Sequence, residues 1–241
     1  MPDRRYLIVN ADDFGQSPGI NQGIIQAHEQ GIVTSASLMV RWPAAGAAAA
    51  YGRAHPEFAV GLHVDLGEWA YRDQTWVQLY QVVADEPAAL VNEVNRQLAT
   101  FRELLGRDPT HLDSHQHVHM QEPARSVLAA IACRLGVPLR RCTAGVRYCG
   151  SFYGQTDTGE AFPEGIQAAA LVALLKRLPA GFTELACHPG VDGDVDSMYR
   201  SERAQEVRAL CDTAVRATLA AEGITLCSFH HPGIAAVAHG A

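Results

Sequence analysis

The 241-residue chain carries a formal net charge of −7 at pH 7 and has a pI of about 5.8. This acidic balance, without a dense cluster of lysine and arginine, argues against a nucleic-acid partner, which requires a basic face. No segment approaches the roughly 20 apolar residues of a membrane span, and the six cysteines include no C-x-x-C pair. Since the start of the chain also lacks a signal-peptide pattern, we expect reduced thiols, no membrane span and a cytoplasmic location.

Short apolar runs alternate with longer stretches of helical periodicity along the chain. The expected strands cover residues 6–10, 35–40, 59–66, 110–119, 137–141, 183–188 and 225–229. The expected helices cover residues 19–30, 87–105, 123–135, 166–178 and 200–222, and the alanine-rich run at 44–50 is also a good helix former. Glycines such as Gly106 and Gly136 follow these stretches, as is typical of helix ends.

Repeated strand–helix alternation predicts an α/β fold with a parallel sheet. About seven such units favour a TIM-barrel-like (β/α) barrel over an open sheet, and the length suits one barrel domain over residues 1–241. Two segments, 67–78 and 147–162, follow expected strands but have little pattern of their own. Each is either an active-site loop or an ordinary surface loop.

Acidic and histidine side chains gather in or just after four expected strands, and parallel barrels build their active sites at such strand ends. They are Asp12 and Asp13, then His63 and Asp65, then Asp113 to His119, and finally His188. Taken singly, Asp12 and Asp13 could form a turn or a helix cap, and His63 could be a hydrogen-bonded core residue. Together they indicate one polar rim.

The segment from His111 to His119 strengthens this interpretation. In a strand, residues 111, 113, 115, 117 and 119 would share one face, because side chains alternate with period two. Burying four histidines and an aspartate there is costly without a partner. We expect a metal to be that partner, with one or two of the histidines lying beyond the strand in solvent.

Aspartate and histidine provide a nitrogen and oxygen ligand set for a divalent ion. Such a set suits zinc with open positions, and also manganese, cobalt or nickel. A metal lowers the pKa of bound water toward 7. Asp12 could then take a proton from that water, and His188 could donate one to the leaving group.

Several blocks of the sequence resemble the YdjC-like carbohydrate deacetylase family, which includes chitooligosaccharide deacetylases and hopanoid-associated sugar deacetylases. The blocks are LIVNADDFG at 7–15, GIVTS at 31–35, GLH at 61–63, THLDSHQHVH at 110–119 and ELACHPG at 184–190. They occur in the family's order and extend over nearly the whole chain. Segments 67–78 and 147–162 match no particular member, so the resemblance does not name the sugar.

The resemblance implies a deformed (β/α) barrel that removes an acetyl group from an N-acetylated sugar or glycoconjugate. It implies a divalent metal on Asp13, His63 and His115, with zinc as the first candidate and magnesium, manganese, cobalt or nickel as alternatives. It also implies Asp12 as the base and, by its placement, His188 as the acid. A homodimer is the oligomeric state it favours.

Three further residues, Asp113, His117 and Trp69, are candidates for contacts around the metal or to substrate. A tryptophan in a loop can stack on a sugar ring or simply cover the edge of a core. Two other functions stay open. One is another metal-dependent amidohydrolase or a phosphoesterase, for which Arg41, Arg140 and Arg147 would be the phosphate-binding candidates. The other is a sugar-binding protein with a structural metal.

Overall fold

The computed structural model describes residues 4–72, 74–82, 86–191 and 197–234. Its strands are β1 (Arg5–Phe14), β2 (Ser35–Leu38), β3 (Ala59–Val64), β4 (Gly67–Arg72), β5 (Thr75–Gln81), β6 (Leu112–Ser114), β7 (Val146–Cys149), β8 (Gly181–Cys187) and β9 (Ile224–Leu226). Its α-helices are α1 (Pro18–Glu29), α2 (Ala45–Ala54), α3 (Pro87–Leu105), α4 (Ala124–Leu135), α5 (Ala168–Leu175), α6 (Ser201–Leu210) and α7 (Thr213–Ala221). Two 3₁₀ helices, η1 (His115–Met120) and η2 (Pro163–Ile166), complete the described part of the chain.

The main sheet is parallel and curled, and its strands run in the order β6-β3-β2-β1-β8-β7. β9 pairs with β1 at residues 5–7, whereas β2 pairs with β1 from Asn10 onward. In the described residues β6 and β7 stand at opposite ends of this order, so the sheet forms a curled half-barrel, and the complete barrel of about seven units that was expected is not confirmed. The α/β class and the parallel sheet are confirmed.

Local sequence signals explain where the helices begin and end. The side chain of Ser17 caps α1 by accepting a hydrogen bond from the backbone N–H of Ile20, and Pro18 occupies the first turn. Gly106 and Gly136 end α3 and α4 in the left-handed conformation. The helix expected over 200–222 is instead two helices, because Asp212 caps the start of α7 with its own side chain.

Three other expectations about the elements are wrong. The strand expected over 110–119 ends at Ser114, where η1 begins with Gln116 and His117 in left-handed conformations. The segment 137–141 forms only one isolated bridge, from Leu139 to Leu112. Segment 67–78 falls largely within the antiparallel hairpin of β4 and β5, and segment 147–162 includes most of β7.

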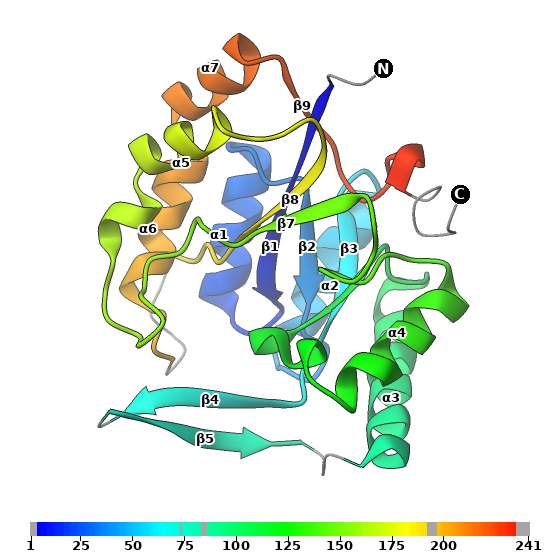
Figure 1. The fold of residues 1–241 in the computed structure, drawn as a ribbon. Coiled ribbons are helices and arrows are strands. Elements are labelled where there is room, and N and C mark those ends of the chain that lie inside the picture. The colour runs from blue at the N-terminus through cyan, green and yellow to red at the C-terminus, as the bar shows by residue number, and fades with distance from the viewer. Residues whose placement is uncertain (1–3, 73, 83–85, 192–196, 235–241) are drawn as a thin grey trace.

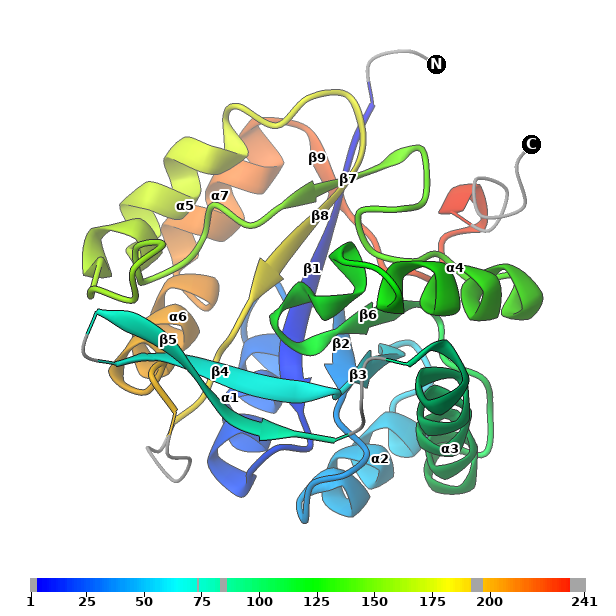
Figure 2. The same ribbon diagram turned by 60° about the horizontal axis from the view of Figure 1, so that its bottom comes forward.

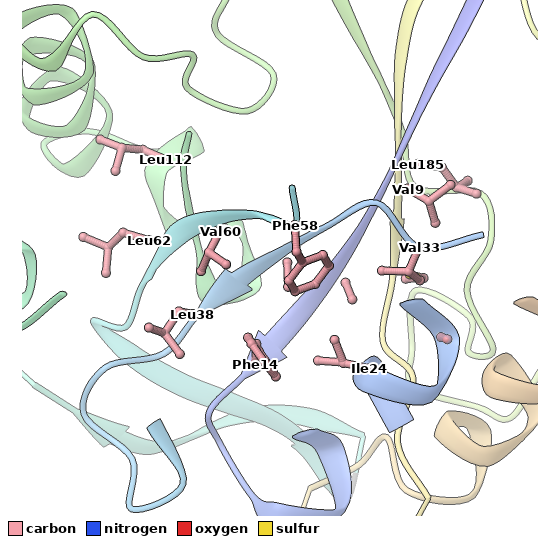
Figure 3. Close-up of a cluster of buried hydrophobic side chains, with 14 of the residues drawn as sticks. Val9, Phe14, Ile24, Val33, Leu38, Phe58, Val60, Leu62, Leu112 and Leu185 are labelled. Atoms are coloured by element: carbon pink, nitrogen blue, oxygen red, sulfur yellow. The ribbon is translucent and has the colours of Figure 1, made fainter. Parts of the chain in front are cut away.

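A continuous apolar core fills the space between the sheet and its helices. Figure 3 shows Phe14, Phe58 and Ile24 packed beside the sheet, together with strand residues such as Val60 and Leu62. The helices cover the outside of the curled sheet, and the β4–β5 hairpin crosses its carboxyl-terminal end (Figures 1 and 2). The carboxyl-terminal ends of the strands therefore face the hairpin. None of the described helices is both long and apolar enough to cross a bilayer.

Candidate active site

Three side chains from separate elements converge at the carboxyl end of the sheet. Asp13 lies near the end of β1, His63 lies in β3, and His115 is the first residue of η1. Asp13 Oδ1 is 3.5 Å from His63 Nε2 and 3.3 Å from His115 Nδ1. One ligand atom from each residue lies within 4.8 Å of the others. These are the three residues that the family resemblance implies as metal ligands.

The unpaired atoms of this group fit a cation. Asp13 Oδ1 and His63 Nε2 are buried and have no hydrogen-bond partner among the described residues. A buried carboxylate oxygen beside buried imidazole nitrogens is costly unless a cation or shared protons satisfy them. Carboxylate oxygen and imidazole nitrogen are also typical ligands of divalent transition metals. Asp13, His63 and His115 could therefore hold one such ion.

Hydrogen bonds behind the group fix two of its members. His63 Nδ1 lies 2.8 Å from Asp113 Oδ1, which leaves Nε2 facing Asp13. Arg203 in α6 donates to Asp13 Oδ2 at 2.7 Å, which leaves Oδ1 facing the histidines. Partners of this kind fix the ring orientation and tautomer of a metal-binding histidine. Asp113 thus contacts His63 on the side away from Asp13.

Asp12 points the opposite way from Asp13 and pairs with a buried arginine. Arg140 Nη1 donates to Asp12 Oδ2 at 2.6 Å, and Nη2 donates to Asp12 Oδ1 at 2.7 Å. The same guanidinium contacts Asp113 Oδ2 at 2.8 Å and Glu184 Oε1 at 2.7 Å. Burial acts to raise the pKa of the Asp12 carboxyl, but Arg140 outweighs it and holds that pKa below its usual value. Asp12 is therefore ionised at neutral pH.

A second group of possible metal ligands, Asp12, His63 and Asp113, is also close enough to share an ion. Arg140 already donates to both of these carboxylates. Its fixed positive charge would repel a metal ion at that position. The geometry therefore favours the group containing Asp13 over this one.

His188 lies just after β8, at the edge of the same site. Its Nε2 is 3.8 Å from Asp12 Oδ2, and its side chain is 22% exposed. Glu206 holds it from below by accepting a hydrogen bond from its backbone N–H, and the Tyr199 hydroxyl donates to the same carboxylate. Burial lowers the pKa of His188 to about 4, so its ring is neutral at pH 7.

The other histidines of the 111–119 segment have partners other than Asp13 and His63. His111 stacks on Phe229 at 3.8 Å between ring centroids. His119 Nδ1 lies 2.6 Å from Ser114 Oγ, and its Nε2 lies 3.1 Å from the backbone oxygen of Arg140. His117 contacts the Tyr148 hydroxyl at 2.9 Å. The predicted row of histidines on one strand face is wrong. It requires a strand that continues to residue 119, whereas the strand ends at Ser114.

A cavity of about 860 Å³ opens in front of these residues. Its lining includes Asp12, Asp13, His63, His115 and His188, and residues from both of the poorly patterned segments. Segment 67–78 contributes Trp69 and Trp76, and segment 147–162 contributes Tyr148 and Tyr153 among others. The third tryptophan, Trp42, is not among the residues that line the cavity and donates its indole N–H to Asp65 at 3.2 Å. The structure therefore places both segments at the site and gives His117 and Trp69 positions in the cavity wall.

Two arginines were not expected at this site. The sequence predicts Arg140 only as a phosphate ligand and indicates no role for Arg203, yet both pair with buried aspartates. For Arg140, the sequence signal is a charged residue that directly follows the apolar residues Val137 to Leu139. The other phosphate candidates are also engaged, since Arg41 pairs with Asp65 and Arg147 donates to the backbone oxygen of Ala180.

Comparison with known proteins identifies the family of this chain. Residues 6–221 match the family model described as YdjC-like protein. The chain belongs to the YdjC-like family. Among family relatives, a carbohydrate deacetylase from Geobacillus stearothermophilus is 32% identical, over 93% of this chain and 97% of its own. A chitooligosaccharide deacetylase from Klebsiella pneumoniae is 35% identical, over 92% of this chain and 97% of its own.

Solved structures show the same architecture as this YdjC-like chain. A putative cellobiose-phosphate cleavage protein from Enterococcus faecalis superposes with a TM-score of 0.73 at 24% identity, covering 94% of this chain and 98% of that one. A family 4 carbohydrate esterase from Streptomyces lividans, in complex with acetate, gives a TM-score of 0.55 at 15% identity and covers 94% and 92%. At these identities the similarity concerns the fold alone.

Proposed function

We propose that this protein is a metal-dependent hydrolase that removes the acetyl group from an N-acetylated sugar or glycoconjugate. The observation that carries the proposal is the convergence of Asp13, His63 and His115 next to Asp12 and His188 in one cavity. Relatives of nearly the same length, named carbohydrate deacetylase and chitooligosaccharide deacetylase, support the substrate class.

Asp13, His63 and His115 would hold one divalent ion, with zinc as the first candidate and magnesium, manganese, cobalt or nickel as alternatives. When bound, the ion would supply Lewis acidity that polarises the acetyl carbonyl and makes a nearby water more acidic. Arg203 keeps Oδ1 of Asp13 turned toward the histidines, and Asp113 keeps Nε2 of His63 turned toward Asp13.

Asp12 would act as the base, with Arg140 holding both of its oxygens in place. Oδ2 of Asp12 would take a proton from the attacking water. His188 would protonate the leaving nitrogen. Since its ring is neutral in the free protein, it would first gain that proton, and Asp12 Oδ2, once protonated, lies 3.8 Å from its Nε2. One proton would thus pass from water to the amine by way of these two side chains.

The alternative functions have less support. Arg41, Arg140 and Arg147, the candidates for a phosphoesterase, are occupied by other partners, although Arg141 lines the cavity. A sugar-binding protein with a structural metal gives no role to Asp12 and His188 beside the ligand group. An amidohydrolase acting on a non-sugar amide differs from the proposal only in its substrate, so the test must vary that substrate.

The experiment is acetate release from a panel of N-acetylated sugars, from monosaccharides through chitooligosaccharides to glycolipids, with the protein stripped by a chelator and then reloaded with single metals. We expect acetate from at least one sugar only after metal is restored. Release that persists without metal contradicts the metal dependence. Hydrolysis of phosphate esters or non-sugar amides in preference to every sugar contradicts the substrate class.

A further inference from the structure

Glu68 in β4 lies in the cavity wall without a partner. It is 8% exposed, and its carboxylate makes no hydrogen bond or ion pair with the part of the chain that the structure describes. Every other carboxylate named above as part of the site is paired, Asp12 with Arg140 and Asp13 with Arg203. A carboxylate that lines a cavity without a protein partner is free to accept hydrogen bonds from a molecule bound there. The Glu68 carboxylate is therefore available to a molecule that enters the cavity.

The local backbone aims Glu68 into the cavity together with its neighbour. Adjacent residues of a regular strand point to opposite faces, yet both Glu68 and Trp69 line the cavity. The register of β4 against β5 shifts between these two residues. An irregularity of this kind re-aims side chains and is common beside active sites. It therefore explains how a carboxylate and an indole come to face the same space.

Gln116 fixes this arrangement relative to the reacting groups. Its side chain accepts a hydrogen bond from the Trp69 backbone N–H at 2.8 Å and donates to the Trp69 backbone oxygen at 2.7 Å. Gln116 directly follows His115, so the clamp ties the hairpin to the candidate metal group. Glu68 itself belongs to neither group of described residues whose ligand atoms lie within 4.8 Å of one another, which separates it from the metal ligands.

We propose that Glu68 is a specificity-determining residue that accepts hydrogen bonds from hydroxyl groups of the sugar ring, with Trp69 as the apolar surface beside it. This inference rests on the proposed sugar substrate and extends it. A carboxylate has two oxygens, each able to accept from a ring hydroxyl, and such charge-assisted bonds are stronger than neutral ones. A substrate without ring hydroxyls would offer this carboxylate no such donor, so the residue favours sugars over other acetylated amines.

The test compares Glu68→Gln with the wild-type protein on two substrates and in metal content. The matched control is Glu103→Gln, which makes the same change at an exposed position of α3. For an N-acetyl chitooligosaccharide, we expect KM to rise by about 10–100-fold with kcat changed much less, because the lost contact forms in the bound substrate as well as in the transition state. For p-nitrophenyl acetate, which has no hydroxyls to recognise, the rate should be unchanged. Metal content should also be unchanged.

Each other result overturns the inference. Loss of metal would make Glu68 a ligand, equal loss on both substrates would place it in catalysis, and no change would remove it from recognition. If the wild-type protein releases no acetate from any sugar, the proposed function fails separately. Calorimetric binding of N-acetyl chitooligosaccharide to the wild type and to Glu68→Gln then decides the role of Glu68: weaker binding to the variant supports it, and equal or absent binding overturns it.

Discussion

Asp12 and Asp13 are neighbours in sequence with opposite environments. Asp13 adopts a left-handed backbone conformation with a φ of 67°, which is uncommon for a non-glycine residue. The turn directs Asp13 toward His63 and His115, whereas Asp12 faces Arg140. A strained residue of this kind is often retained where function needs its geometry. The two carboxylates should therefore respond differently to substitution.

Replacing one of the candidate metal ligands, Asp13, His63 or His115, should remove metal and activity together. In His115→Ala we expect metal content, measured by atomic emission after dialysis, to fall with acetate release. His119→Gln is the control, since His119 contacts Ser114 and the Arg140 backbone rather than Asp13. Its metal content should stay near that of the wild type. Full metal occupancy in His115→Ala would refute the ligand assignment.

Replacing Asp12 should separate catalysis from metal binding. Asp12→Asn preserves the shape of the side chain but makes it a poor base. We expect activity to fall by about 10²–10⁴-fold, the usual contribution of a positioned acid or base, with metal content retained. Circular dichroism would check that the variant is still folded. Metal loss in Asp12→Asn would instead identify Asp12 as a ligand.

His188 can be tested through the leaving group. An amide nitrogen leaves poorly until it is protonated, whereas an activated phenolate leaves without that help. His188→Ala should therefore reduce hydrolysis of an N-acetyl sugar much more than hydrolysis of p-nitrophenyl acetate, with unchanged metal. Equal damage to both substrates would indicate a positioning role, and no damage would make His188 an ordinary wall residue.

Among the elements, the β4–β5 hairpin is joined to the rest of the described chain by hydrogen bonds at Trp69, Tyr71 and Tyr80. Most residues of β5 are exposed, and the two hydrogen bonds from Gln116 link β4 to η1. Gln116→Ala should loosen the hairpin, since each bond contributes about 0.5–1.5 kcal/mol. We expect faster amide hydrogen exchange in β4 and β5 and a higher KM for sugar substrates.

Gln30→Ala, at the far end of α1, provides the matched control and should leave both measurements unchanged. An exchange rate in Gln116→Ala equal to that of the wild type would show that other contacts hold the hairpin. Loss of metal in Gln116→Ala, in turn, would show that the clamp supports His115 more than it supports the hairpin.

In the whole molecule, buried neutral histidines should make stability fall on acidification. Burial lowers the pKa of His111 to about 3 and that of His119 to about 4. Between these values and about 6.5, the unfolded chain binds protons that the folded chain does not, so the free energy of unfolding falls as pH falls. From pH 7 to pH 5 each such histidine should lower it by about 1–2 kcal/mol.

Urea unfolding of the chelator-treated protein at both pH values measures this loss without proton exchange by a metal. His111→Gln should lose less stability between pH 7 and pH 5 than the wild type does, because one titrating group is gone. A loss of stability in His111→Gln equal to that of the wild type would show that His111 is not held neutral.

A single domain, a homodimer and a cytoplasmic location stay predictions.

The sequence alone predicted those features that depend on local pattern. The apolar runs and helical periodicities located most strands of the main sheet and most of the helices. Burial of one face of a helix makes apolar residues repeat at a regular spacing along the sequence. Family motifs predicted the residues that the structure brings together, Asp13, His63 and His115, although their roles await experiment. The broad class followed from alternating strands and helices.

The tertiary structure decided what depends on distant partners. Whether the sheet closes depends on pairing between its ends, which no local pattern encodes, and the described sheet is open. The prediction of a strand through His119 is wrong because the strand ends at Ser114 and η1 follows. Within η1, Gln116 and His117 take left-handed conformations that their side chains do not signal. Arg140 and Arg203 meet their aspartates across 128 and 190 residues of chain. Burial makes such pairs necessary, but only folding brings the partners together.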